Sequence, residues 1–148
     1  MKISTKGRYG LRAMLDLATH ATEGTPVYLS DIARREGISE KYLEHIFGAL
    51  HKAGLVKSLR GRNGGYLLTK LPDEITLKEI ITVLEGPCSL VDCVSDEKSC
   101  PKTNMCVTRE IWSLLGHKIE EVLTGYTLAT LAELQIQKTQ HNMPMYHI

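Results

Sequence analysis

Apolar residues recur at helical spacing along most of this 148-residue chain. Near the start, Leu11, Met14, Leu15 and Ala18 follow the i, i+3, i+4, i+7 spacing of an amphipathic helix. The segment EGTP (residues 23–26) should end this helix, with Gly24 at the C′ position and a proline that cannot continue the hydrogen-bond ladder. An amphipathic helix is therefore predicted near the N-terminus.

Two further helices are predicted in residues 29–36 and 40–53, and glycines at positions 37 and 54 should end them. The short turn GIS joins these helices and offers Ser39 as the N-cap of the second. Two helices joined by a tight turn that contains glycine are typical of a helix-turn-helix. In that motif, outward-facing residues near the start of the second helix reach base edges.

Residues 55–70, LVKSLRGRNGGYLLTK, break the helical pattern with two short β-prone runs. The run Asn63-Gly64-Gly65 between them can supply the positive φ angles that a tight hairpin needs. Arg60 and Arg62 would then lie at or beside the tip, where arginine can enter a narrow minor groove. The spacing G-x-x-x-x-G-K-[ST] of a phosphate-binding loop is absent. We therefore predict a winged helix-turn-helix domain over residues 1–75.

The second half of the sequence predicts another amphipathic helix in residues 76–87 and a long helix from residue 107 to about 125. The apolar stripe of the long helix has a 4-4-4-3 spacing: Val107, Ile111, Leu115, Ile119 and Val122. This stripe is longer than a small winged-helix domain needs to cover. With a shorter helix in residues 126–137, capped by Thr127, it predicts a dimerisation element over residues 107–138. The alternative is that the long helix completes an intramolecular core.

Residues 139–148 are expected to be a flexible tail. The predicted fold class is mainly α with a small β-hairpin wing.

Charge divides the chain into two halves. Residues 1–70 hold 12 Lys and Arg against 6 Asp and Glu, whereas residues 71–148 hold 6 against 11. A basic half favours nucleic acid as its partner.

No apolar run approaches the roughly 18 residues of a membrane span, and polar residues interrupt the N-terminal apolar stretch, so we expect a cytoplasmic protein without a secretory signal. Neither paired carboxylates nor a C-x-x-C motif indicates an enzyme.

All four cysteines lie in residues 88–106, CSLVDCVSDEKSCPKTNMC, between the two predicted helices of the second half. Disulfides rarely persist in the cytoplasm. The spacing lacks the C-x₂₋₄-C pairs of structural zinc sites, whereas three thiolates on a polar loop suit an iron–sulfur cluster. A zinc site and a thiol-only redox switch, with Cys88 and Cys93 five positions apart, remain open alternatives.

The stretch ISEKYLEHIFGALHKAGLVKSLRGRNGGYLLTK, the cysteine loop and TREIWSLLGHKI together resemble one family of winged-helix repressors. That family is typified by the regulator of iron–sulfur cluster biogenesis and also contains repressors that sense nitric oxide or control cysteine metabolism. The resemblance covers residues 1 to 135. It implies a homodimer that binds a pseudo-palindromic operator in double-stranded DNA.

The resemblance also implies roles for individual residues. Base contacts are implied for Ser39, Lys41, Tyr42 and Glu44, a minor-groove contact for Arg60 with Arg62 beside it, and phosphate contacts for Ser4, Thr5, Lys6 and Tyr9. The cluster ligands are implied to be Cys93, Cys100 and Cys106, within a linking segment of residues 76–106. A 2Fe–2S cluster is favoured over a 4Fe–4S cluster.

The fourth ligand departs from the family pattern. The iron–sulfur regulator has a histidine three residues after the last cysteine, where this chain has Arg109. The nitric oxide sensor uses an acidic residue near the N-terminus, where this chain has Arg8. Cys88 and Glu110 are the candidates that remain in the chain. The predicted function is a repressor of iron–sulfur cluster biogenesis; the alternatives are a nitric-oxide-sensing repressor and a zinc- or thiol-dependent DNA-binding protein.

Overall fold

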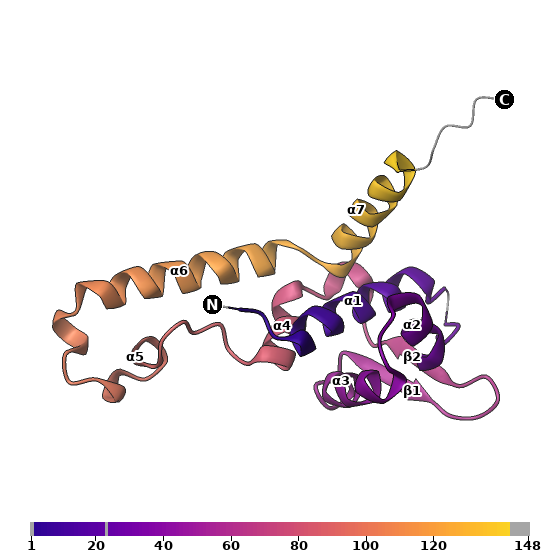
Figure 1. The fold of residues 1–148 in the computed structure, drawn as a ribbon, viewed down its shortest axis with the longest axis horizontal. Helices are drawn as coiled ribbons and strands as arrows, with labels where there is room; N and C mark the ends of the chain where they lie inside the picture. The colour runs from indigo at the N-terminus through magenta and orange to yellow at the C-terminus, as the bar shows by residue number, and fades with distance from the viewer. Residues whose placement is uncertain (1, 23, 143–148) are drawn as a thin grey trace.

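The computed structural model of the chain describes residues 2–22 and 24–142. Its winged-helix body contains α1 (Thr5–His20), α2 (Leu29–Glu36), α3 (Glu40–Lys52), the hairpin β1 (Val56–Leu59) and β2 (Gly65–Leu68), η1 (Pro72–Glu74) and α4 (Leu77–Glu85). Short elements α5 (Asp92–Ser95), η2 (Glu97–Ser99) and η3 (Thr103–Met105) follow, and then α6 (Val107–Gly125) and α7 (Leu128–His141). Figure 1 shows the α5 segment leading away from the body, α6 running back toward the body, and α7 following next to it. The predicted fold class is confirmed.

The hydrophobic core lies between α1, α2, α3 and α4 and is closed by the first residue of α7. Its fully buried side chains include Met14, Leu17, Ile32, Phe47, Ile80 and Leu128. In α3, Leu43, Ile46, Phe47 and Leu50 form one buried apolar stripe. In α1 the buried face is centred on Ala13, Met14 and Leu17, and Leu15 is only partly buried. Helices α2, α4 and α7 all pack on α1, and together they cover a wider face than the sequence pattern indicated.

Local signals set most helix ends. The Ser39 hydroxyl caps α3 by accepting from the Tyr42 main-chain N–H at 3.3 Å. Gly54 takes φ +76° after α3, and hydrogen bonds from Leu55 N to Leu50 O and from Gly54 N to His51 O complete a Schellman motif. Helix α1 is different, because it ends at His20 with Ala21 as its C-cap. Gly24, which has φ +80°, therefore turns the following loop and is not the C′ residue that we expected.

The wing is an antiparallel hairpin in which Val56 pairs with Leu68 and Leu59 with Gly65. The predicted hairpin is present, and Gly65 supplies a positive φ as expected, but Gly64 does not. Gly61 and Gly65 have φ of +103° and +131°, and Gly64 is not among the glycines with positive φ. Gly64 is needed for another reason: a Cβ there would lie 2.6 Å from the Leu59 carbonyl oxygen. A side chain at this position would therefore force the turn open.

Helix α6 contributes almost nothing to the core, since Gly116 is its one buried residue. The apolar stripe is instead exposed, with exposed fractions of 72% for Val107, 51% for Ile111 and 60% for Val122. Helix α7 begins at the predicted cap, Thr127, and continues to His141, so residues 139–141 are helical. The remainder of the expected tail, residues 143–148, lies outside the described residues. Within the described part of the chain, none of the helices combines the length and apolar character of a membrane span.

Candidate nucleic-acid interface and cysteine segment

The first turns of α3 present the predicted base-reading residues. Ser39, Lys41 and Glu44 are exposed, whereas Leu43, Ile46 and Phe47 on the opposite face anchor the helix in the core. A lysine can donate to phosphate or guanine oxygens, and a glutamate can accept from the cytosine amino group. The helix therefore exposes donors and an acceptor from a rigid support.

Tyr42 is partly buried and packs edge-on against Tyr9 of α1, with ring centroids 6.1 Å apart. The guanidinium carbons of Arg8 and Arg12 lie 5.9 and 5.6 Å from the Tyr9 ring centroid. The structure thus brings two predicted contact residues, Tyr9 and Tyr42, into one cluster with two arginines. Sequence analysis did not select Arg8 and Arg12 individually, although the basic charge of the first half included them. Arg12 also forms an ion pair within the protein, because its Nε donates to the Glu36 carboxylate at 2.9 Å.

The wing is braced at both ends. Tyr66 of β2 packs against Phe47 of α3 with ring centroids 4.8 Å apart, and it pairs through its main chain with Val27. Near the tip, the Tyr28 hydroxyl donates to the Arg62 carbonyl oxygen at 2.6 Å. The Arg60 and Arg62 residues themselves are exposed. The fold therefore holds both arginines on the outside of a fixed hairpin beside α3, as a groove-entering wing requires.

The predicted phosphate-contacting residues begin α1. Ser4 is its N-cap and accepts from the Gly7 main-chain N–H at 3.0 Å, and Thr5 and Lys6 form the first turn. Thr5 is exposed and Lys6 partly so. Main-chain N–H groups at a helix start, together with a basic side chain, are suited to bind phosphate. The carboxylate of Glu85 also reaches this helix start from α4.

The cysteine segment, residues 88–106, connects the end of α4 to the start of α6 through α5, η2 and η3. All four cysteines are free thiols and partly buried. The buried Thr103 hydroxyl holds the loop together through the carbonyl oxygens of Glu97, at 3.0 Å, and Cys100, at 2.5 Å. The segment therefore has internal order of its own while leaving its thiols accessible.

Cys106 is the N-cap of α6 and has an unusual environment. Its Sγ lies 3.2 Å from the Thr108 hydroxyl. Hydrogen bonding from the Thr108 hydroxyl and then from the Arg109 main-chain N–H lowers the pKa of the Cys106 thiol below its ordinary value. The thiolate is the form of cysteine that acts as a nucleophile and as a metal ligand. The environment of Cys106 therefore favours its reactive, deprotonated form.

Arg109 stands where the resemblance placed a histidine ligand, and it has a different role. Its Nε donates to the Cys93 carbonyl oxygen at 2.8 Å, and its Nη2 lies 3.3 Å from Glu97 Oε1. The side chain therefore ties the first turn of α6 to α5 and η2. Guanidinium groups stay protonated in proteins and donate hydrogen bonds, so Arg109 braces the loop and is not a ligand.

The predicted metal ligands do not lie together in the described part of the structure. Among residues 2–22 and 24–142, no group of three or more His, Cys, Asp or Glu side chains lies close enough together to hold a metal ion. The predicted set of Cys93, Cys100 and Cys106, with Cys88 or Glu110, is thus present on one segment but does not converge. Three thiols on one polar segment are the donors that an iron–sulfur cluster takes, and holding a cluster would require this loop to bring them together.

An ion pair between a buried carboxylate and a more exposed arginine was missed by sequence analysis. The Asp16 side chain on α1 is 3% exposed and accepts from Arg35 Nε at 2.8 Å and Nη2 at 2.6 Å. This pair joins α1 to the end of α2, and the nearby carboxylate raises the pKa of Arg35 through its hydrogen bond. The two residues lie 19 positions apart in different helices, so no local pattern links them.

Known proteins match this chain over most of its length. Residues 3–134 match the Rrf2 family, described as an iron-dependent transcriptional regulator. The chain is 48% identical over 132 residues to the HTH-type transcriptional regulator CymR of Bacillus subtilis, which covers 89% of this chain and 90% of that protein. It is 43% identical over 135 residues to the HTH-type transcriptional regulator IscR of Erwinia tasmaniensis, which covers 91% of this chain and 81% of that protein.

Solved structures of two such regulators share the fold. IscR of T. potens superposes with a TM-score of 0.77 at 42% identity, covering 99% of this chain and 97% of that one. CymR, named the global cysteine regulator of B. subtilis, superposes with a TM-score of 0.76 at 46% identity, covering 90% of this chain and 98% of that one. These relatives are transcriptional regulators and not enzymes, as the sequence predicted. With its recognition helix and wing both exposed, the chain belongs to the Rrf2 family of DNA-binding transcriptional regulators.

Proposed function

We propose that this chain works as a homodimeric repressor that binds a pseudo-palindromic operator and responds to iron–sulfur status through its cysteine segment. The observation that carries the DNA-binding part is the joint exposure of the α3 start and the arginine-tipped wing on a rigid core. Two copies related by two-fold symmetry would place their recognition helices in successive major grooves, about 34 Å apart.

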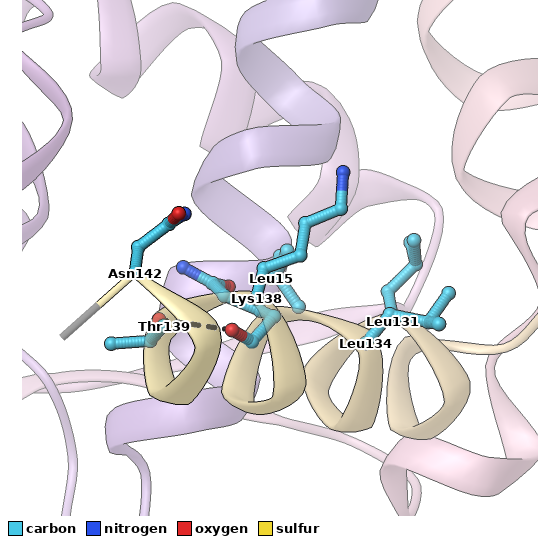
Figure 2. Close-up of a pocket in the computed structure, with 7 residues that line it drawn as sticks. Leu15, Leu131, Leu134, Lys138, Thr139 and Asn142 are labelled. Atoms are coloured by element: carbon cyan, nitrogen blue, oxygen red, sulfur yellow. Dashed lines mark hydrogen bonds between the residues drawn. The ribbon is translucent and has the colours of Figure 1, made fainter.

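The exposed stripe of α6 supports the homodimer. Val107, Ile111 and Val122 on this helix are more than half exposed, and isolated apolar stripes of this length mark interaction surfaces. A groove of about 600 Å³ between α1 and α7 offers a second apolar surface on the same protomer. Figure 2 shows Leu131 and Leu134 of α7 facing this groove close to Leu15 of α1. We infer that a second copy covers both surfaces.

Sequence selection tests the base-reading role of α3. Replacing Glu44 with alanine should change the operator sequence that is selected from a random duplex pool, because the cytosine-accepting carboxylate is lost; about 1–3 kcal/mol of discrimination is expected at the affected base pair. Glu40→Ala is the matched control, since Glu40 lies exposed on the first turn of the same helix. A Glu44→Ala variant that selects the wild-type operator and only binds all DNA more weakly would contradict the assignment.

The sensing part of the proposal is supported by position. The cysteine segment follows Gly86 and Pro87 at the end of α4, which packs on α1 and α3, and it ends at Cys106, the N-cap of α6. A change in this segment can therefore reach both the DNA-binding body and the proposed dimer helix. A coupling of about 1–3 kcal/mol would give a 5- to 150-fold change in operator affinity. Iron–sulfur status as the signal is supported by the three-cysteine pattern and by the IscR relatives.

The second candidate is a regulator that responds through its thiols alone. It is favoured by the lowered pKa of Cys106, by the separation of the cysteine side chains, and by the similarity to CymR. In this case the oxidation state of the segment would alter operator binding without any bound iron.

Iron and sulfide analysis of protein purified without oxygen separates the two candidates. The iron–sulfur proposal expects iron, acid-labile sulfide and visible absorption, which serine at position 93, 100 or 106 should abolish. Cys88→Ser tests the further ligand: lost iron would assign Cys88 to the cluster, and retained iron would exclude it. Iron-free protein whose operator affinity still changes with thiol oxidation would support the thiol-only candidate instead.

A further inference from the structure

The carboxylate of Glu85, the last residue of α4, is hydrogen-bonded to the start of α1. Its Oε1 accepts from the Ser4 main-chain N–H at 3.1 Å and from the Ser4 hydroxyl. The two residues are 81 positions apart, so packing of α4 on α1 creates the contact. Both hydrogen-bond donors of Ser4 are thereby occupied by an internal anion.

Electrostatics favours this contact. A helix start carries partial positive charge and a helix end partial negative charge, so a carboxylate is favoured near the former. The first turn of α1 contains no acidic residue of its own, and Glu85 supplies a carboxylate there. Glu85 is the last residue of α4, where the partial negative charge of the helix end disfavours a carboxylate. The glycine at position 7 leaves space for the carboxylate, because a Cβ there would overlap Glu85 Oε1. The carboxylate thus occupies a fitted position at this helix start.

We propose that Glu85 is an intramolecular competitor of the DNA phosphates at the start of α1. This inference rests on the proposed operator binding, in which Ser4, Thr5 and Lys6 contact phosphates. A phosphate at Ser4 would need the donors that Glu85 now holds and would lie beside a second negative charge. The carboxylate therefore lowers DNA affinity and must move, or be tolerated at a cost, when the protein binds. Glu85 also directly precedes Gly86, whose φ of +89° begins the connection to the cysteine segment.

Binding of a fluorescent duplex at several salt concentrations tests the competition. Glu85→Gln keeps the shape and the hydrogen-bond-accepting oxygen but removes the charge. Its affinity for duplex DNA should rise about three- to tenfold at low salt, because one repulsive charge is removed near the phosphates. The slope of log K against log salt should steepen by about one counterion per added phosphate contact. Thermal unfolding and sizing confirm that the variant keeps its fold and oligomeric state.

Asp73→Asn is the matched control, since it removes one negative charge from an exposed position on η1, which packs against α7. It should leave the affinity and the salt slope unchanged. Ser4→Ala should cost more affinity in the Glu85→Gln background than in the wild type, because a neutral amide competes with a phosphate for the Ser4 donors less strongly than a carboxylate does.

Three results would overturn the inference: Glu85→Gln binding no tighter than the wild type, an equal gain in Asp73→Asn, or identical Ser4→Ala costs in both backgrounds. Absence of duplex binding by every protein, wild type included, would instead refute the proposed operator binding on which the inference depends.

Discussion

Replacing Ile111 with glutamate should convert the proposed homodimer into monomers and reduce operator affinity by about 100-fold or more, because both half-sites can then no longer be bound as one unit. Ile111 lies on the exposed α6 stripe, one turn after Val107. A two-fold interface contains each residue twice, so the substitution would bury two carboxylates in an apolar contact. Such charges are buried only at a cost of several kcal/mol when they lack partners.

Sizing by light scattering and operator binding would check this result side by side. Thr124→Glu adds the same charge to the same helix, at an exposed position about half a turn away from the apolar stripe. It should remain dimeric and bind the operator normally. Dimeric Ile111→Glu protein, or wild-type protein that is already monomeric at micromolar concentration, would show that α6 is not the dimer element.

Replacing Asp16 with alanine should lower the free energy of unfolding by about 2 kcal/mol, because it removes two charge-assisted hydrogen bonds between α1 and α2. The Asp16 carboxylate is almost fully buried and receives two hydrogen bonds from one guanidinium. The His20 ring Nδ1 also lies 3.6 Å from Asp16 Oδ1. Since α1 and α2 support the recognition helix, the loss should also weaken operator binding at temperatures near the unfolding midpoint.

Urea-induced unfolding at one fixed protein concentration measures this change, because dimerisation makes stability depend on concentration. Asp31→Ala is the matched control. It removes a carboxylate that pairs with Arg34 one turn away on the surface of α2, where the Arg34 side chain is 75% exposed. That pair should contribute no more than about 0.5 kcal/mol. Similar losses in the two variants would mean that burial of Asp16 is energetically unimportant.

Much of the DNA-binding half could be predicted from sequence because its signals are local. The α3 helix, its Ser39 cap and its Gly54 end depend on residues within a few positions of each other. The hairpin and the exposure of Arg60 and Arg62 follow from a turn between two β-prone runs. The end of α1 and the roles of the wing glycines were predicted less well, because several local conformations suit the same residues and tertiary contacts choose among them.

By itself, the sequence determined the order and type of the longer helices, the wing, and the apolar stripe of α6, since periodicity and capping act within single elements. It did not predict the short elements α5, η1, η2 and η3. Only the tertiary structure decided which polar partner each charged side chain contacts. Asp16 with Arg35, Arg109 with Cys93 and Glu85 with Ser4 are separated by 19, 16 and 81 positions, and each pair forms because packing brings two elements together. The same holds for the cysteines: a shared segment places them near one another in sequence, but the loop conformation decides whether their side chains converge, and in the described residues they do not.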